Sequence, residues 1–404
     1  MTKGNEVDDL KKRALEYHAF PVPGKLTVES SKPCETQGDL SLAYTPGVAA
    51  PVLEIQADPD CAYRYTNKGN LIAVISDGTA VLGLGNVGAL ASKPVMEGKA
   101  VLFKRFAGID VFDIEVNAKT PDEFIETVVN IAPTFGGINL EDIAAPHCFY
   151  IENELKKRLN IPVFHDDQHG TAVIVAGALL NALEIQGKTL PKAKIVFLGA
   201  GAAGCSCAKL LQSMGATHIT MVDRSGVLDT NRQDLHDNNR VLAVAPSHAN
   251  TLADVMHDAD VFIGVSAKNA LDAALVKRMA KNPIIFALAN PDPEILPSVA
   301  HAIRDDILMA TGRSDFPNQV NNALCFPYLF KGALNAKATQ ITEAMKIAAA
   351  HALSELAREP VPADVLAAYG LNTLTFGKDY IIPKPFDRRL LDKISTAVAN
   401  AAKV

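Results

Sequence analysis

Short apolar runs, each bounded by glycine, proline or charged residues, recur along the chain and predict buried strands. In the N-terminal half such runs cover 71–78, 100–106, 108–116, 136–143 and 161–167. Segments of helical character lie at 7–19, 121–131 and 150–159. Pro121 with two acids behind it is a good signal for a helix start. The alternation of strand and helix predicts a mixed or parallel sheet.

A nearly all-apolar segment at 171–186 predicts a helix that is buried on every side. After it, KIVFLG at 194–199 opens a second and clearer series, with further strands predicted at 217–223, 259–265 and 283–290. Two more helices are predicted at 338–357 and 389–403, and the segment 22–60, rich in Pro, Gly and Ser, is expected to wrap a surface. The pattern predicts an α/β protein with a domain boundary near 160–190.

Composition and charge narrow the class of protein. A chain of 404 residues, with 48% hydrophobic and 21% charged residues, is expected to form two or three domains of an ordinary soluble protein. The formal charge of -6 provides no basic footprint, so a nucleic-acid partner is not expected. No apolar run reaches the roughly 18 residues of a membrane span, and the charged N-terminus lacks a signal-peptide core. A cytoplasmic location is expected. Cys205 and Cys207 are expected in a helical core.

A glycine-rich loop at 199–204 has the context of a dinucleotide-binding site. Gly199, Gly201 and Gly204 follow the strand KIVFL and precede an apolar helix, and the next strand ends at Asp223. An acid in that place binds the ribose 2′-hydroxyl, and the pyrophosphate would lie on the helix N-terminus. Asp223 favours NAD over NADP, although the adjacent Arg224 could neutralise a 2′-phosphate.

A second match to the same glycine pattern lies at 83–88. The segment after it, 100–106, ends in cations instead of an acid, so the context that a dinucleotide site requires is missing. We interpret Gly83, Gly85 and Gly88 as a tight turn between elements.

Two acidic pairs follow predicted strands, Glu141-Asp142 after GGINL and Asp166-Asp167 after IPVFH. Carboxylates gathered at strand ends repel one another unless a cation lies among them. Oxygen ligands favour Mg²⁺ or Mn²⁺. The alternative is a solvent-exposed strand end followed by a helix cap.

Two histidines beside the second acidic pair raise the possibility of zinc. His165 and His169 have the spacing that places two imidazoles on one helical face. The residues before them look like a strand, and the helix is predicted to start near Gly170-Thr171. The two rings are therefore not expected to share a face, and carboxylates dominate the cluster.

The chain resembles the malic enzyme family in its short bacterial form. The resemblance runs from about residue 40 to residue 384 and rests on many motifs, among them SLAYTPGVA, PVMEGKAVLFKRFAGID, TFGGINLEDIAAP, IPVFHDDQHGTA, FALANPDPEI and TGRSDFPNQVNN. It implies a fold with an N-terminal α/β substrate domain over 1–160, a Rossmann-type doubly wound parallel-sheet NAD(P) domain over 161–385 and a C-terminal helix over 386–404. It also implies oxidation and decarboxylation of L-malate to pyruvate and CO₂.

The same resemblance implies site residues with distinct roles. Lys99 matches the general base, which requires a lowered pKa, and Tyr44 matches the general acid. The other implied residues are the metal ligands Glu141, Asp142 and Asp167, with Asp166 behind them; the malate-binding Asn290 and Asn321, with Asn322 weaker; and the cofactor loop with Gly199, Gly201, Ala202, Ala203, Gly204, Asp223 and Arg224.

One position departs from the family pattern. Longer members carry an arginine that binds a malate carboxylate where this chain has Ala80. Another cation is expected to serve, and the candidates are Lys104, Arg105, Arg64 and Lys68. The acetyltransferase-like domain appended in larger bacterial relatives is not expected, because the chain ends at residue 404.

Two other functions remain open from the sequence. A malolactic enzyme would convert malate to lactate and CO₂ without net redox, and a catalytically silent ligand-binding relative would keep only the fold. The retained Lys99, Tyr44 and acidic residues argue against the second. A homodimer or larger homo-oligomer is expected.

Overall fold

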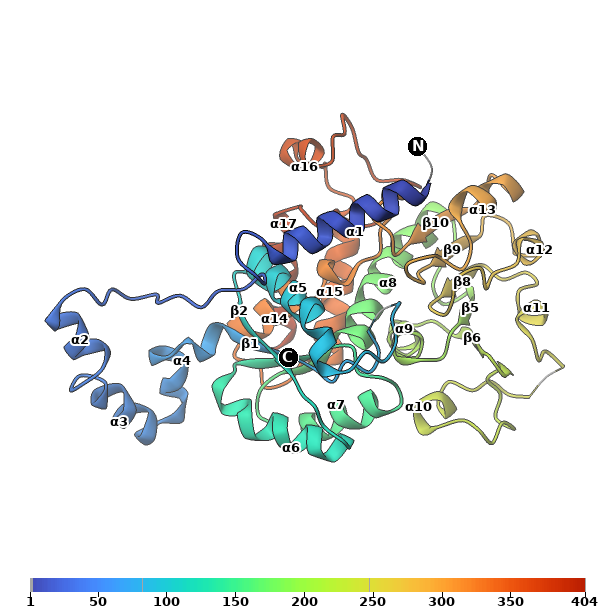
Figure 1. Cartoon of the computed structure of the whole chain (residues 1–404). Helices are drawn as coiled ribbons and strands as arrows, with labels where there is room; N and C mark the ends of the chain where they lie inside the picture. The colour runs from blue at the N-terminus through green and yellow to red at the C-terminus, as the bar shows by residue number, and fades with distance from the viewer. Residues whose placement is uncertain (1–2, 82, 247, 404) are drawn as a thin grey trace.

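The computed structural model describes residues 3–81, 83–246 and 248–403 (Figure 1). Within them, a first sheet of four parallel strands has the order β2-β1-β3-β4. Its strands are β1 (Leu71–Ser76), β2 (Asp110–Glu115), β3 (Gly137–Leu140) and β4 (Val163–His165). The helices that accompany it are α5 (Ala89–Ala107), α6 (Pro121–Ile131) and α7 (His147–Arg158). All four strands were predicted from the apolar pattern.

The predicted strand at 100–106 is wrong, because this segment is the second half of helix α5. Five side chains of α5 are buried, and they recur every three or four residues: Ser92, Met96, Ala100, Phe103 and Ala107. This is the period of a helix packed on one side. The apolar run AVLF hid that period, because short apolar runs look alike in strands and buried helices.

The second sheet, within the described residues, has six strands in the order β10-β9-β8-β5-β6-β7, and only β7 is antiparallel. The strands are β5 (Lys194–Leu198), β6 (His218–Asp223), β7 (Gly226–Val227), β8 (Val261–Gly264), β9 (Ile284–Ala287) and β10 (Leu308–Thr311). The intervening helices are α9 (Ala202–Ser213), α10 (Asp237–Arg240), α11 (Leu252–Val255), α12 (Ala273–Lys277) and α13 (Pro297–Ile303). The order reverses beside β5, which is where a doubly wound sheet binds its ligand.

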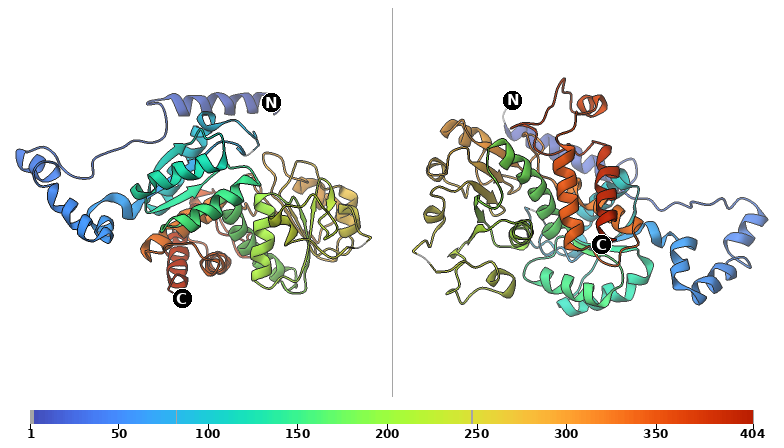
Figure 2. Two further views of the ribbon diagram at one scale, coloured as in Figure 1. Left: turned by 90° about the horizontal axis from the view of Figure 1, so that it is seen from below. Right: turned by 180° about the vertical axis from the view of Figure 1, so that it is seen from behind.

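Helix α8 (Asp166–Ile185) links the two sheets, and most of its side chains are buried, as predicted. It packs against α9 and against the C-terminal helix α15 (Glu343–Leu356). The other C-terminal helices are η4 (Asn322–Leu324), α14 (Phe326–Asn335), α16 (Ala363–Ala368) and α17 (Arg389–Ala401). Because α14 packs against α5, the chain returns to the first sheet after completing the second (Figure 2). The boundaries at 160 and 385 stay a prediction.

The N-terminal segment follows the body only in part: residues 3–19 lie along it, whereas residues 37–57 project from it instead of wrapping it (Figures 1 and 2). It contains α1 (Lys3–Ala19), α2 (Gln37–Ala43), α3 (Ala49–Ala57), η1 (Pro59–Cys61), α4 (Ala62–Tyr65) and η2 (Asn67–Asn70). We call 36–65, with α2 to α4, the arm. No side chain of α2 or α3 is buried, and the exposed set includes Leu42, Val52 and Leu53. A search of the described residues finds no helix long and apolar enough to cross a membrane.

Candidate active site

The two acidic pairs meet at the carboxyl edge of the first sheet. Glu141 and Asp142 follow β3, and Asp166 and Asp167 follow the neighbouring strand β4. The helix after β4 begins at Asp166, so the predicted start near 170–171 is wrong. The second pair therefore lies in the first turn of α8. Negative side chains are favourable there, because free backbone N–H groups point out of a helix N-terminus.

Three of these acids form a group suited to a divalent cation. One oxygen each from Glu141, Asp142 and Asp167 lies within 4.8 Å of the others, and this is the sole such group among the described residues. Glu141 and Asp142 are buried, and Oδ2 of Asp142 has no hydrogen-bond partner among those residues. Burial, with the charge of Asp167 second, raises the pKa of Asp142 to about 7. An all-oxygen set with excess negative charge fits Mg²⁺ or Mn²⁺.

Lys99 on helix α5 stands between the two acidic pairs. Its Nζ lies 2.8 Å from Oε1 of Glu141 and 2.8 Å from Oδ2 of Asp166. It also lies 4.3 Å from the centre of the Phe326 ring. Burial alone would lower the pKa of Lys99, but the charges of Asp166 and Glu141 outweigh burial and raise it. A neutral lysine at this position therefore requires that the carboxylate charge be offset.

Asp166 lies outside the metal group and is completely buried. Its Oδ2 accepts hydrogen bonds from Lys99 and, at 3.0 Å, from the Asn322 side chain. One turn later on α8, a Cβ at Gly170 would overlap Oδ1 of Asp166. Gly170 therefore leaves the space in which this carboxylate reaches Lys99.

The predicted substrate amides lie at the carboxyl edge of the second sheet and in the segment after it. Asn290 follows β9, and its side chain occupies the space that a Cβ at Gly312 would enter. Asn321 caps η4, where its Oδ1 accepts a hydrogen bond from the backbone of Ala323. The neighbouring Asn322, the weaker candidate, is the one that contacts Asp166.

The first glycine loop faces Asn290 and Pro291. A Cβ at Gly83 would lie 3.4 Å from Cδ of Pro291. Gly83 and Gly85 have φ of 76°, and Val81 and Gly85 form a tight turn through paired backbone hydrogen bonds. The predicted tight turn is confirmed, and the structure adds that this turn contacts the loop after β9.

Tyr44, the predicted acid, lies on the arm and is 69% exposed. It follows helix α2, and the arm projects away from the carboxyl edge of the first sheet (Figures 1 and 2). The single chain therefore does not bring Tyr44 to Lys99.

The second glycine loop has the close packing that a dinucleotide site requires. Gly199 has φ of 116°, and a Cβ there would lie 2.7 Å from the carbonyl oxygen of Val265. A Cβ at Gly204 would overlap the carbonyl oxygen of Gly199. Gly201 precedes helix α9, which starts with Ala202 and Ala203, and a Cβ at Gly201 would meet nothing within 4 Å. The helix N-terminus is open to an anion such as a pyrophosphate.

Asp223, at the end of β6, forms an ion pair with Arg232, which was not predicted from the sequence. The Arg232 guanidinium donates to both Asp223 oxygens, at 2.8 and 2.9 Å, and also binds Asp234. Arg224 is exposed. Arg232 therefore offsets the charge with which Asp223 would repel a 2′-phosphate.

The histidines do not form a zinc site. His169 makes hydrogen bonds of 2.9 Å through Nε2 to both oxygens of Glu152 on α7. His165 is buried and precedes the helix. Among the described residues, neither belongs to a metal-binding group.

The four cations proposed in place of the missing arginine bind elsewhere. Lys104 pairs with Asp110, and Lys68 donates to the backbone oxygens of Pro133 and Phe135. Arg64 stacks on Tyr65 in the arm, and Arg105 lines a separate cavity with Phe106 and Tyr328.

Sequence reasoning missed a cation beside Asn290 and an amide in the acidic cluster. Arg313 donates to the carbonyl oxygen of Pro291 at 3.1 Å. Asn139 is buried in β3, and its side chain donates to Glu141 at 2.9 Å. A polar residue inside the apolar run GGINL was the available signal for Asn139.

Comparison with known proteins identifies the family. Residues 23–121 and 117–156 match the sequence model for the malic enzyme N-terminal domain, and residues 168–367 match the model for the malic enzyme NAD binding domain. The NADP-dependent malic enzyme of Halomonas elongata is 58% identical over 98% of this chain and 94% of its own length. The NAD-dependent malic enzyme of Rhizobium meliloti is 55% identical over 98% of this chain, which spans 51% of that relative.

A solved structure leads to the same conclusion. The malic enzyme of Pyrococcus horikoshii matches with a TM-score of 0.89 and 42% identity, covering 98% of this chain and 90% of that one. The two family models together cover most of the chain, and relatives of nearly the same length and a solved structure match it as well. These matches agree with the geometry of the acidic cluster and the glycine loop. The chain belongs to the malic enzyme family.

Proposed function

We propose that this protein catalyses the oxidative decarboxylation of L-malate to pyruvate and CO₂, with reduction of NAD(P). The observation that carries the proposal is the position of Lys99, whose amine lies 2.8 Å from both Glu141 and Asp166 beside an oxygen-only metal group. A positioned base next to a hard-cation site is what removal of a hydroxyl proton from a chelating hydroxyacid requires.

Each residue has a part in that reaction. Lys99 takes the proton of the C2 hydroxyl while hydride passes to the nicotinamide. Glu141, Asp142 and Asp167 hold a divalent ion, Mg²⁺ or Mn²⁺, which when bound supplies Lewis acidity to the malate oxygens and positive charge beside Lys99. Asn290 and Asn321 orient the malate carboxylates. Asp166 positions Lys99 by accepting its hydrogen bond, and Asn322 donates to the same oxygen of Asp166.

We infer NAD as the preferred cofactor, with NADP also accepted. Asp223 ends β6 in the place from which an acid binds the ribose 2′-hydroxyl. Arg232 forms a bidentate pair with Asp223, and this reduces the repulsion of a 2′-phosphate. The close relatives carry both names, NAD-dependent and NADP-dependent.

Tyr44 serves as the acid that protonates the enolpyruvate carbon, and we propose that it serves a second copy of the chain. The arm exposes an apolar surface that includes Leu42, Val52 and Leu53. A helical segment with several large apolar side chains exposed and none buried is a candidate for covering by a partner. In a symmetric homodimer, the arm of each subunit would deliver Tyr44 to the other active site.

The activity is tested by incubating the protein with malate and Mn²⁺, using NAD and NADP in parallel, with and without EDTA. We expect reduced cofactor and pyruvate with both nucleotides, a higher kcat/KM with NAD, and loss of activity in EDTA. A product of lactate without reduced cofactor would point to the malolactic reaction, and turnover after complete metal removal would refute the metal assignment.

Substitution of Asp142 by asparagine is expected to stabilise the metal-free protein while abolishing its response to metal. The raised pKa of Asp142, about 7 when folded, means that the metal-free protein loses stability as pH rises from about 4 through 7. Asparagine removes that charge and tolerates the left-handed backbone at this position, where φ is 54°. Thermal unfolding in EDTA at pH 8 should show a higher midpoint for the variant, and Mn²⁺ should raise the midpoint of the wild type only.

Asp258 provides a matched control, because it also has a left-handed backbone, with φ of 55°, and is exposed. Asp258→Asn should leave both the metal-free midpoint and the response to Mn²⁺ unchanged. A metal-free Asp142→Asn protein that unfolds below the wild type would show that the cluster is not electrostatically strained.

A further inference from the structure

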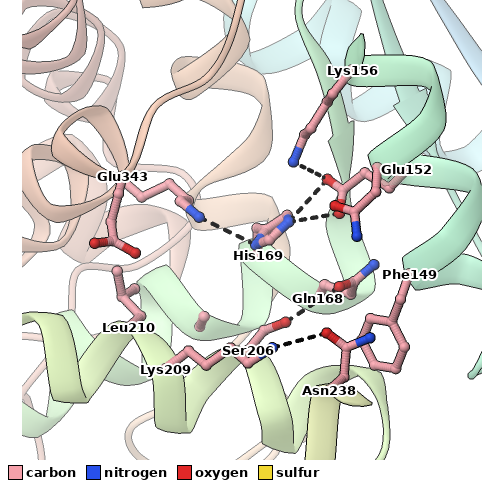
Figure 3. A pocket seen from close by; sticks show the side chains of 13 residues that line it. Phe149, Glu152, Lys156, Gln168, His169, Ser206, Lys209, Leu210, Asn238 and Glu343 are labelled. Atoms are coloured by element: carbon pink, nitrogen blue, oxygen red, sulfur yellow. Dashed lines mark hydrogen bonds and ion pairs between the residues drawn. The ribbon is translucent and has the colours of Figure 1, made fainter. Parts of the chain in front are cut away.

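A cavity of about 140 Å³ lies between helices α7, α8, α9 and α15, apart from the acidic cluster and the glycine loop (Figure 3). Its charged and titratable lining residues are three lysines, two acids and a histidine: Lys156, Lys209, Lys346, Glu152, Glu343 and His169. None of the residues assigned above to malate, metal or nucleotide lines it. The cavity is smaller than the roughly 300 Å³ at which pockets for drug-sized ligands begin, so its ligand would be smaller than a nucleotide.

Three lysines converge on this cavity, and two of them have no acidic partner. Lys209 donates to the side-chain oxygen of Asn238 at 2.9 Å, and Lys346 lies 3.4 Å from Nδ1 of His169. Within the described part of the chain, neither ammonium forms an ion pair with a carboxylate, and burial lowers the pKa of both. Lys156 does pair with Glu152, at 2.7 Å. The carboxylates of Glu152 and Glu343 act on Lys346 without forming an ion pair with it, and burial still outweighs their charges. A desolvated ammonium without a paired carboxylate is costly, and an anion bound beside both lysines would reduce that cost.

A fourth donor in the same cavity is an amide. Gln168 is 3% exposed, and its Nε2 has no hydrogen-bond partner among the described residues. Its other side-chain atom, Oε1, accepts a long hydrogen bond of 3.5 Å from Ser206 (Figure 3). Buried amide donors are almost always satisfied in folded proteins, so an unsatisfied one beside two unpaired lysines indicates a missing acceptor.

We propose that this cavity is a second ligand site, which binds a small anion with two or more charged oxygens, such as inorganic phosphate or a short dicarboxylate. Two ammonium groups and one amide N–H₂ supply donors from three helices, α8, α9 and α15. Charge-assisted hydrogen bonds of this kind are the strong ones, and several converging donors select a multivalent anion over chloride.

The cavity touches the helix turn that carries the acidic residues, so binding there is linked to the active site. His169 lies two residues after Asp167, and Oε1 of Glu152 accepts from both the His169 ring and the backbone N–H of His165. An anion that draws Lys156 away from Glu152 would change how Glu152 holds this turn. This link rests on the proposed function, whereas the binding site itself does not.

Calorimetric titration of the full chain tests the site. Phosphate and succinate are titrated separately into protein saturated with NAD, at constant ionic strength set with NaCl. We expect one anion per chain, with Kd at least tenfold weaker after Lys346→Met or Lys209→Met. Lys157→Met is the matched control, since Lys157 on the same helix as Lys156 is 70% exposed and pairs with Glu154; it should bind as the wild type does.

Binding of either phosphate or succinate supports the site, and the comparison of the two Kd values identifies the preferred anion. Absence of binding to the folded wild type at 20 mM of either anion, or equal Kd in the wild type and both lysine variants, would overturn the proposal. Thermal midpoints confirm that each variant is folded, and Lys209→Met serves if Lys346→Met unfolds. None of these outcomes depends on malate turnover.

Discussion

Replacement of Lys99 by alanine is expected to lower kcat for malate oxidation by about 10²- to 10⁴-fold, the range that a positioned general base contributes. The amine of Lys99 is the cation in contact with both Glu141 and Asp166. The substitution removes the ion pair with Glu141 but leaves the three metal ligands and the glycine loop in the chain. NAD binding, measured by calorimetry, should therefore stay within a few fold of the wild type. Activity should return in part when methylamine is added, because the small amine can enter the space that the side chain leaves.

Lys93→Ala provides the control for this experiment. Lys93 lies on the same helix, α5, and pairs with Asp113 and Glu115 instead of the acidic cluster. It should retain kcat. If Lys99→Ala turns malate over at the wild-type rate, or if Lys93→Ala loses as much activity as Lys99→Ala, Lys99 is not the base.

A hybrid dimer of two inactive variants is expected to have about half of the wild-type activity. Tyr44→Phe removes the acid and Lys99→Ala removes the base, and each homodimer should be inactive by itself. If the arm delivers Tyr44 to the partner, half of the randomly formed dimers are hybrids, and each hybrid has one complete site out of two. The two variants, carrying different tags, are co-expressed, and hybrids are isolated through both tags before the malate assay.

The activity of the hybrid shows whether Tyr44 acts in its own chain or in the partner. If Tyr44 acted within its own chain, every subunit of a hybrid would lack either the acid or the base, and mixing would restore nothing. A control hybrid of Tyr44→Phe with wild type should retain about half of the activity under both arrangements. Failure of the tagged chains to associate at all would refute the proposed dimer.

Much of the fold could be predicted because its elements have strong local signals. Helix α6 begins at Pro121 and ends at Ile131, as expected from the proline, the acids behind it and the amphipathic pattern, and Thr120 caps it. The four strands of the first sheet and strands β5, β6, β8 and β9 of the second were recognisable as continuous apolar runs, which are typical of strands in parallel sheets. Strands β7 and β10 were not predicted. The same rule gave a wrong strand prediction for the second half of α5. Its apolar run AVLF belongs to a helix that buries one face.

The candidate site was predictable where the chain itself brings residues together, at the ends of adjacent strands. Glu141 and Asp167 meet because β3 and β4 are neighbours in a parallel sheet. Contacts that no periodic pattern encodes had no signal, and these include the Arg232 pair with Asp223, nine residues apart, and the Phe326 ring over Lys99. The role of Tyr44 stays a prediction, and a role that a second copy completes would leave no signal in the periodicity of one chain.

Gly170 makes helix α8 less stable than alanine would, and it leaves the space that the Asp166 carboxylate needs beside Lys99. Glycine within a helix is destabilising by about 1 kcal/mol relative to alanine, because its backbone loses more freedom on folding. Alanine would strengthen the second turn of α8, yet its methyl group would displace the Asp166 carboxylate from beside Lys99. A more stable helix and a correctly placed Asp166 carboxylate therefore make opposite demands at this position, and glycine meets the second of them.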